Sequence, residues 1–160
     1  TSEAKLQLSA IYSALTSLQS DYDAFATCLE DAGYVAPSGN SHYYALGFAQ
    51  DNPDARAIVT ANGGTCEQTK DGTDQFQFGA GKTVGGYKAD AGDVGSINVR
   101  SVFNDSENEG NFDSPGVDEF GSYFVAGAVG AIDSDFRTPD TASQWVINEN
   151  KALKEVVKGY

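Results

Sequence analysis

The sequence predicts an α+β fold in which a long N-terminal helix packs on an antiparallel β-sheet. Residues 1–32 carry one uninterrupted helical stripe of apolar side chains, without Gly or Pro. After Gly33, short β-like runs alternate with turn residues, and 18 glycines in the chain suit turns better than helices. A chain of 160 residues without a linker predicts one domain over 1–160, with a helical spine at 1–32 and a sheet head at 33–160.

The helix prediction depends on apolar residues that recur every three or four positions. They are Ala4, Leu8, Ile11, Leu15, Leu18, Tyr22, Phe25 and Leu29. Gly33 and Pro37 suit the end of this helix. No capping box precedes it, so we expect a continuation of a longer helix that has been cut or processed. A bundle helix or a coiled-coil arm stays open, although no later segment repeats the helical pattern.

Six β-strands are expected in the remainder of the chain. The predicted ranges are 42–49, 55–60, 75–78, 96–103, 123–132 and 144–148. Residues 152–157 are expected either to pair back as a hairpin strand or to form a short terminal helix. One helix followed by mostly antiparallel strands is the order of an α+β domain.

The composition excludes several classes of partner. Ten Lys and Arg against 23 Asp and Glu leave a net charge of −13, whereas nucleic acids and anionic membrane surfaces require basic patches. The longest apolar run, 123–132, is shorter than the ~18 residues of a membrane span. We therefore expect neither nucleic-acid binding nor a membrane span within these residues.

Residue patterns of catalysis and of cofactor binding are missing from the sequence. His42 is the only histidine and has no nucleophile motif around it, so we expect a non-catalytic protein without a cofactor. The acidic segment 105–116 begins like a calcium loop but has Gly116 where a bidentate Glu is needed. The alternative to an ordinary acidic loop is a looser calcium site, either in this segment or at Asp133, Asp135 and Asp140.

Two cysteines, Cys28 and Cys66, leave two interpretations open. They form either one disulfide in an oxidising compartment or two inert buried thiols. We favour the disulfide.

Two segments resemble the type IV pilins of bacteria. Residues 2–12, with Tyr22 and the 32–34 segment, are similar to the region that follows the membrane segment of pilins, delta-proteobacterial-style major pilins above all. Residues 144–151 are similar to the Trp-x-Ile-Asp/Asn hairpin near the end of many pilins. The resemblance covers less than half of the chain, and pseudopilins of type II secretion systems share these motifs.

The resemblance implies a structural subunit of an extracellular filament that serves attachment and twitching motility. The subunit would be anchored in the inner membrane before assembly by an upstream apolar helix with an N-methylated first residue. Its partners would be further copies of itself, the pilus assembly machinery and a host or prey surface. Alternatives are a pseudopilin of a type II secretion system and a secreted ligand-binding module.

The resemblance also assigns roles to particular residues. The apolar stripe would hold the helix on the sheet through Leu8, Ile11, Leu15, Leu18, Tyr22 and Phe25, with Leu29 at its end. The polar helix face and the acidic loop at 105–119 would meet neighbouring subunits or solvent. Many pilins join two cysteines near the C-terminus, whereas a Cys28–Cys66 bridge would clamp the end of the helix to a later loop.

Overall fold

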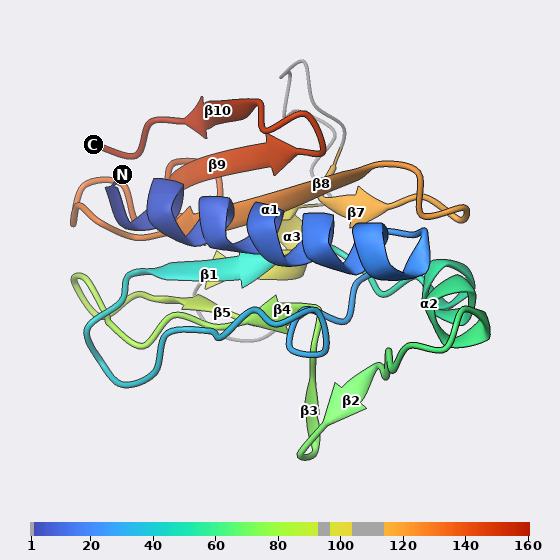
Figure 1. Ribbon diagram of the computed structural model, residues 1–160. Helices are drawn as coiled ribbons and strands as arrows, with labels where there is room; N and C mark the ends of the chain where they lie inside the picture. The colour runs from blue at the N-terminus through green and yellow to red at the C-terminus, as the bar shows by residue number, and fades with distance from the viewer. Residues whose placement is uncertain (1, 93–96, 104–113) are drawn as a thin grey trace.

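The computed structural model describes residues 2–92, 97–103 and 114–160, and it shows an α+β arrangement (Figure 1). The helix α1 (Ser2–Tyr22) lies lengthwise across one face of an antiparallel sheet. The predicted fold class is therefore confirmed for its two main parts, the N-terminal helix and the antiparallel sheet.

Five strands form the main path of this sheet. They are β1 (Tyr44–Gly47), β4 (Gln77–Phe78), β8 (Phe124–Gly130), β9 (Ser143–Asn148) and β10 (Leu153–Val157), in the spatial order β10-β9-β8-β1-β4. Every pairing along the path is antiparallel. Because β9 and β10 form a hairpin, the strand alternative for residues 152–157 is confirmed.

Shorter strands extend this framework. β7 (Gly116–Val117) pairs with the beginning of β8, beyond the end of β1. β2 (Thr69–Lys70) and β3 (Thr73–Asp74) form a separate small hairpin, which projects beyond the β4 edge of the sheet (Figure 1). β5 (Ala89–Asp90) and β6 (Ile97–Asn98) form a parallel pair, so the strands are not all antiparallel.

The helix α1 ends ten residues earlier than its apolar stripe predicts. Asp23 adopts a left-handed conformation with φ of 65°, which stops the helix after Tyr22. Beyond it, the Phe25 amide donates to the Gly121 carbonyl, and the Leu29 amide donates to the Thr27 and Gln75 carbonyls. Phe25 and Leu29 are buried as the stripe predicts, but they lie on a packed irregular segment.

The strand prediction for residues 55–60 is wrong, because this segment belongs to the helix α2 (Pro53–Ala61). The Asn52 side chain caps the helix by accepting hydrogen bonds from two backbone amides, and Pro53 occupies the first turn, where its missing N–H costs nothing. Buried Ala55 and Val59 stand four residues apart, on one helical face. The capping signal is therefore visible in the sequence.

Other predicted strands exist over shorter ranges. The 96–103 prediction is right only for β6, because the chain continues as the short helix α3 (Val99–Phe103), and residue 96 lies outside the described residues. The strands expected at 42–49 and 75–78 shrink to β1 and β4. Those expected at 123–132 and 144–148 correspond closely to β8 and β9.

Both faces of the sheet are covered, which explains why all seven residues of β8 are buried. On one face, the α1 stripe packs with Phe124, Ala126 and Trp145. On the other face, α3 packs with β8, behind the sheet in Figure 1. Gly127 permits this second contact, because a Cβ atom there would lie 2.7 Å from the Phe103 ring.

Candidate functional site

The interface between α1 and the sheet contains most of the residues that the sequence singles out. Leu8, Ile11 and Leu15 are fully buried, and Leu18 is buried almost completely. Tyr22 is partly buried and packs at the edge of the same core. The two last members of the stripe, Phe25 and Leu29, join this core from the segment that follows the helix.

Polar contacts fix the N-terminal half of α1 to the rest of the molecule. The Glu3 carboxylate accepts hydrogen bonds from the backbone amides of Tyr43 (2.9 Å) and Tyr44 (3.2 Å), at the start of β1. One turn later, the Tyr34 hydroxyl donates to Gln7 Oε1 at 2.8 Å. Burial raises the pKa of the Tyr34 hydroxyl, and the Glu3 charge adds to this effect. The helix is thus held in register as well as packed.

The helix α1 and the C-terminal β9–β10 hairpin contact each other through cation–π pairs. Lys5 of α1 lies 5.1 Å from the centre of the Trp145 ring on β9. Lys151, in the β9–β10 turn, lies 5.7 Å from the centre of the Tyr12 ring on α1. These two pairs therefore join α1 to the C-terminal hairpin, which is far away in the sequence.

The outer face of α1 is the candidate interaction surface. Between Ala4 and Ser20 the helix carries no Asp or Glu, although the chain has 23 of them. Its exposed residues in this stretch are mostly small or polar. They are Lys5, Leu6, Ala10, Ser13, Thr16, Ser17 and Ser20. We call these seven residues the outer helix face.

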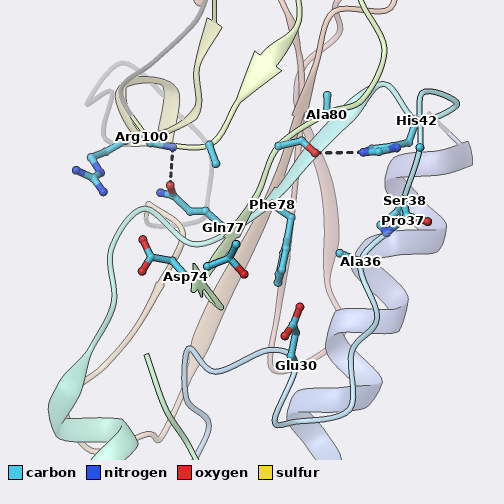
Figure 2. Close-up of a pocket in the computed structure, with 15 residues that line it drawn as sticks. Glu30, Ala36, Pro37, Ser38, His42, Asp74, Gln77, Phe78, Ala80 and Arg100 are labelled. Carbon is cyan, nitrogen blue, oxygen red and sulfur yellow. Dashed lines mark hydrogen bonds between the residues drawn. The ribbon is translucent and has the colours of Figure 1, made fainter. Parts of the chain in front are cut away.

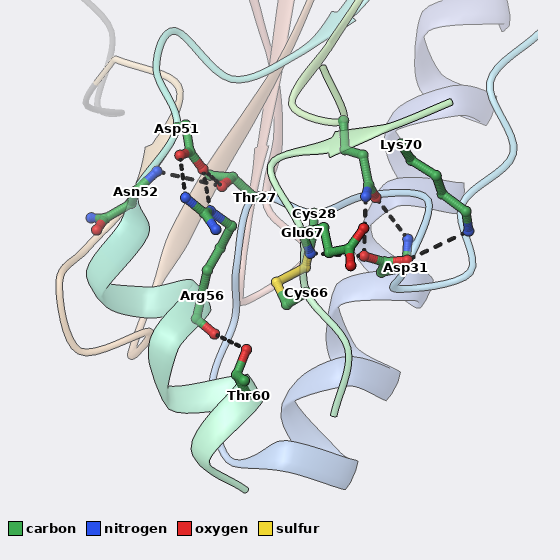
Figure 3. Close-up of a disulfide and its surroundings, with 11 residues drawn as sticks. Thr27, Cys28, Asp31, Asp51, Asn52, Arg56, Thr60, Cys66, Glu67 and Lys70 are labelled. Carbon is green, nitrogen blue, oxygen red and sulfur yellow. Dashed lines mark hydrogen bonds and ion pairs between the residues drawn. A yellow bond between two sulfur atoms is a disulfide. The ribbon is translucent and has the colours of Figure 1, made fainter. Parts of the chain in front are cut away.

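A disulfide between Cys28 and Cys66 joins the segment after α1 to the segment after α2 (Figure 3). The bridge that the sequence favours is therefore present. Next to it, Asp31 accepts hydrogen bonds from the Glu67 amide (2.9 Å) and the Gln75 side chain (3.0 Å), and it pairs with Lys70 at 3.4 Å. The disulfide and Asp31 together secure the chain that leads to the β2–β3 hairpin.

A second charged cluster lies at the start of α2, and the sequence analysis missed it. Asp51 pairs with the Arg56 guanidinium through two contacts of 2.8 Å and accepts a 2.6 Å hydrogen bond from the Thr27 hydroxyl (Figure 3). Burial alone raises the pKa of the Asp51 carboxyl, but the hydrogen bonds from Arg56 and Thr27 and the guanidinium charge hold it below its usual value. In the sequence, Asp51 and Arg56 are five residues apart and flank the N-cap residue Asn52, and this pattern could have indicated the ion pair.

Asp51 makes the stability of the fold sensitive to acid. Because its pKa is depressed in the folded protein, the carboxylate stabilises the fold above its unfolded pKa of about 4, and this contribution is lost as the pH falls through the folded pKa. We expect Asp51→Asn to lower the free energy of unfolding at pH 7 by roughly 1–3 kcal/mol, the typical value for hydrogen bonds to charged groups. Urea unfolding at several pH values measures the difference.

The gap between wild type and Asp51→Asn should narrow as the pH falls from about 4 through the depressed folded pKa of Asp51, because the folded carboxyl becomes neutral only over that range. The exposed Asp54 supplies the matched control, and Asp54→Asn should change stability by less than about 0.5 kcal/mol. A gap that stays constant down to pH 2 contradicts the assigned role of Asp51.

The predicted calcium residues are not assembled into a site. Within residues 2–92, 97–103 and 114–160, no group of three His, Cys, Asp or Glu side chains is placed to hold a metal ion. Asp133, Asp135 and Asp140 belong to this described part, and Asp133 accepts a hydrogen bond from the Asp135 amide. Of the acidic loop at 105–119, residues 105–113 lie outside the described residues.

The His42 side chain is buried and hydrogen-bonded to the backbone. Its ring Nε2 donates a hydrogen bond to the Gly79 carbonyl at 3.1 Å.

Among the helices of the described residues, none is long and apolar enough to cross a membrane.

Comparison with known proteins does not place the chain in a family. No protein-family model matches it, and no curated protein sequence matches it. The function must therefore be inferred from the geometry and from the resemblance of the two segments.

Proposed function

We propose that this chain is the ectodomain of a type IV pilin, a non-catalytic structural subunit of an extracellular filament for attachment and twitching motility. One observation carries the proposal: α1 buries one stripe on an antiparallel sheet, and between Ala4 and Ser20 it leaves a face of mostly small and polar residues, without Asp or Glu, exposed. A subunit that polymerises through its helix needs a buried side to orient the helix and a free side to meet neighbouring copies.

The charge distribution supports self-association through this face. Copies of a subunit with a net charge of −13 repel one another, so contacts must form where acidic residues are missing. The outer helix face meets that requirement, because Lys5 is its single charged residue. Small side chains also allow helices to approach closely.

Contacts between the two resembling segments give further support. The pairs of Lys5 with Trp145 and of Lys151 with Tyr12 bring the N-terminal motif and the C-terminal hairpin motif into contact. The position of the disulfide differs from that of the C-terminal bridge of many pilins. It joins Cys28 to Cys66 and so secures the chain before the β2–β3 hairpin. In this proposal it stabilises the head and forms no C-terminal adhesive loop.

The proposal names partners and a location. The subunit would be held in the inner membrane by an upstream helix before assembly, and it would then join copies of itself in a pilus outside the cell. The assembly machinery and a host or prey surface would be its other partners.

Ala10→Arg on the outer helix face should abolish or strongly reduce filaments, because a bulky charge would enter the contact between copies. The measurement is the amount of subunit in sheared surface filaments of cells that carry the variant in the native gene, with electron microscopy of the cells. Ala61→Arg is the matched control, since Ala61 is an exposed alanine at the end of a different helix, and it should leave filaments unchanged.

Equal filament yields from both variants and wild type, with equal subunit levels in the cells, would contradict the role of the outer helix face. Wild-type cells without surface filaments, in which deletion of the gene stops protein secretion, would indicate the pseudopilin alternative instead.

A further inference from the structure

A cavity of about 520 Å³ lies beside β4, between this strand and the chain segment 36–39 (Figure 2). Its volume is within the ~300–1,000 Å³ of typical small-ligand sites. Part of its wall is apolar, from Ala36, Pro37, Phe78 and Ala80. The filament proposal does not use this cavity.

The wall of the cavity is held in place by its own contacts. The Phe78 ring packs against the Tyr34 ring with centroids 5.9 Å apart. The buried Gln77 side chain donates to the Phe48 carbonyl at 2.9 Å and accepts from the Gly92 amide at 2.7 Å. A preformed wall lowers the entropy cost of binding.

Glu30 supplies a carboxylate that no cation among the described residues neutralises. Figure 2 shows this carboxylate directed into the cavity, below the Phe78 ring. The half-buried Glu30 side chain has no ion pair or hydrogen bond with any residue that the structure describes, whereas the adjacent Asp31 is paired with Lys70 and with two donors. A half-buried carboxylate without a partner is a ready site for a cation.

The rest of the lining restricts where a cation binds. Asp74 stands at the exposed side of the cavity and adds a second negative charge, while Arg100 lies on the other side of Gln77 from Glu30 (Figure 2). The cation is therefore expected at Glu30, away from the Arg100 guanidinium. The net charge of −13 raises the local concentration of cations around the whole molecule.

We propose that this cavity binds a primary alkylammonium group, with the ammonium on Glu30 and the alkyl chain along the apolar wall at Phe78. Lysine side chains behave similarly on protein surfaces, where the apolar stem lies along apolar surface and the charged head stays in a polar environment. The group comes from a free alkylamine or from a lysine side chain of a second copy, because both present the same chemistry.

The probe is n-pentylammonium, titrated into the ¹⁵N-labelled protein and followed by amide NMR shifts. We expect saturable shifts confined to the amides of Glu30, of residues 36, 38 and 39 and of residues 77–80, and at least tenfold weaker binding of 1-pentanol, which has no charge. Glu30→Gln should weaken binding of n-pentylammonium at least tenfold. The matched control is Glu119→Gln, since Glu119 is exposed and belongs to the β7–β8 turn, and it should bind as the wild type does.

Equal affinities of wild type and Glu30→Gln overturn the proposal, as do shifts that spread over all acidic surfaces without saturation. The NMR spectrum of each variant reports whether it is folded. Should Glu30→Gln not fold, Ala36→Leu, which fills the cavity from its apolar side, must abolish the shifts for the proposal to stand.

Sedimentation equilibrium distinguishes the two sources of the group. Self-association that both n-pentylammonium and Glu30→Gln suppress identifies a lysine of a second copy, and a monomer under all conditions identifies a free amine. The NMR result does not depend on filaments, so the binding site and the proposed filament function succeed or fail separately.

Discussion

Leu8→Ala should lower the free energy of unfolding by about 2–5 kcal/mol, the usual cost of a large-to-small substitution in a well-packed core. Leu8 is fully buried in the middle of the α1 stripe, among side chains of the sheet. The substitution removes three buried carbon atoms and leaves a cavity that the rigid sheet closes only in part. Urea denaturation of the purified chain, followed by circular dichroism, measures the change.

The same helix provides the control for this prediction. Leu6 stands two residues away and is 68% exposed, so Leu6→Ala should change stability by less than about 0.5 kcal/mol. Equal losses for the two variants would show that α1 does not pack on the sheet through the face that contains Leu8. A loss at Leu6 alone would reverse the assignment of buried and outer faces.

Replacing both cysteines, in Cys28→Ser with Cys66→Ser, should lower the free energy of unfolding by about 4 kcal/mol. The two residues are 38 positions apart in the sequence, and a loop of this length restricts the unfolded chain by about that amount in the chain-entropy model. The loss should be seen as a lower midpoint of thermal or urea unfolding. The main physical cause of this loss of stability is the larger conformational entropy of the unfolded chain without the disulfide, rather than a lost contact in the folded protein.

Reduction of the wild type provides an independent check on the disulfide. A reducing agent should lower the unfolding midpoint of the wild type to about that of the double variant, and it should leave the double variant unchanged. An unfolding midpoint of the wild type that is insensitive to the reducing agent, under conditions where mass spectrometry shows both thiols free, would contradict a stabilising role for the bridge.

Sequence periodicity located burial more reliably than it located secondary structure. Phe25 and Leu29 continue the apolar spacing of α1 and are buried, yet Asp23 ends the helix before them. Apolar spacing reports which side chains avoid water, whereas the end of a helix depends on one residue with positive φ and on distant carbonyls that accept the following amides. Neither of these is encoded in the spacing.

In the α2 segment, a local sequence signal indicates the secondary structure, and only one contact of the charged cluster comes from a distant segment. Asn52 followed by Pro53 is a local signal for the start of a helix, although the residues 55–60 that follow were expected to form a strand. The Asp51–Arg56 pair is local as well, but Thr27, which completes the cluster, comes from a segment 24 residues earlier. Only the folded chain brings that hydroxyl to Asp51.

The sequence by itself determined the α+β class, the buried stripe of α1, the central strands β8 and β9 and the polar character of the outer side of α1. These features follow from hydrophobic periodicity and composition, which act locally along the chain. Tertiary structure alone decided the coverage of the second face of the sheet by α3, the pairing of Lys5 with Trp145 and the cavity that Glu30 lines. Such features depend on contacts between distant segments, whose geometry is set when the whole core packs.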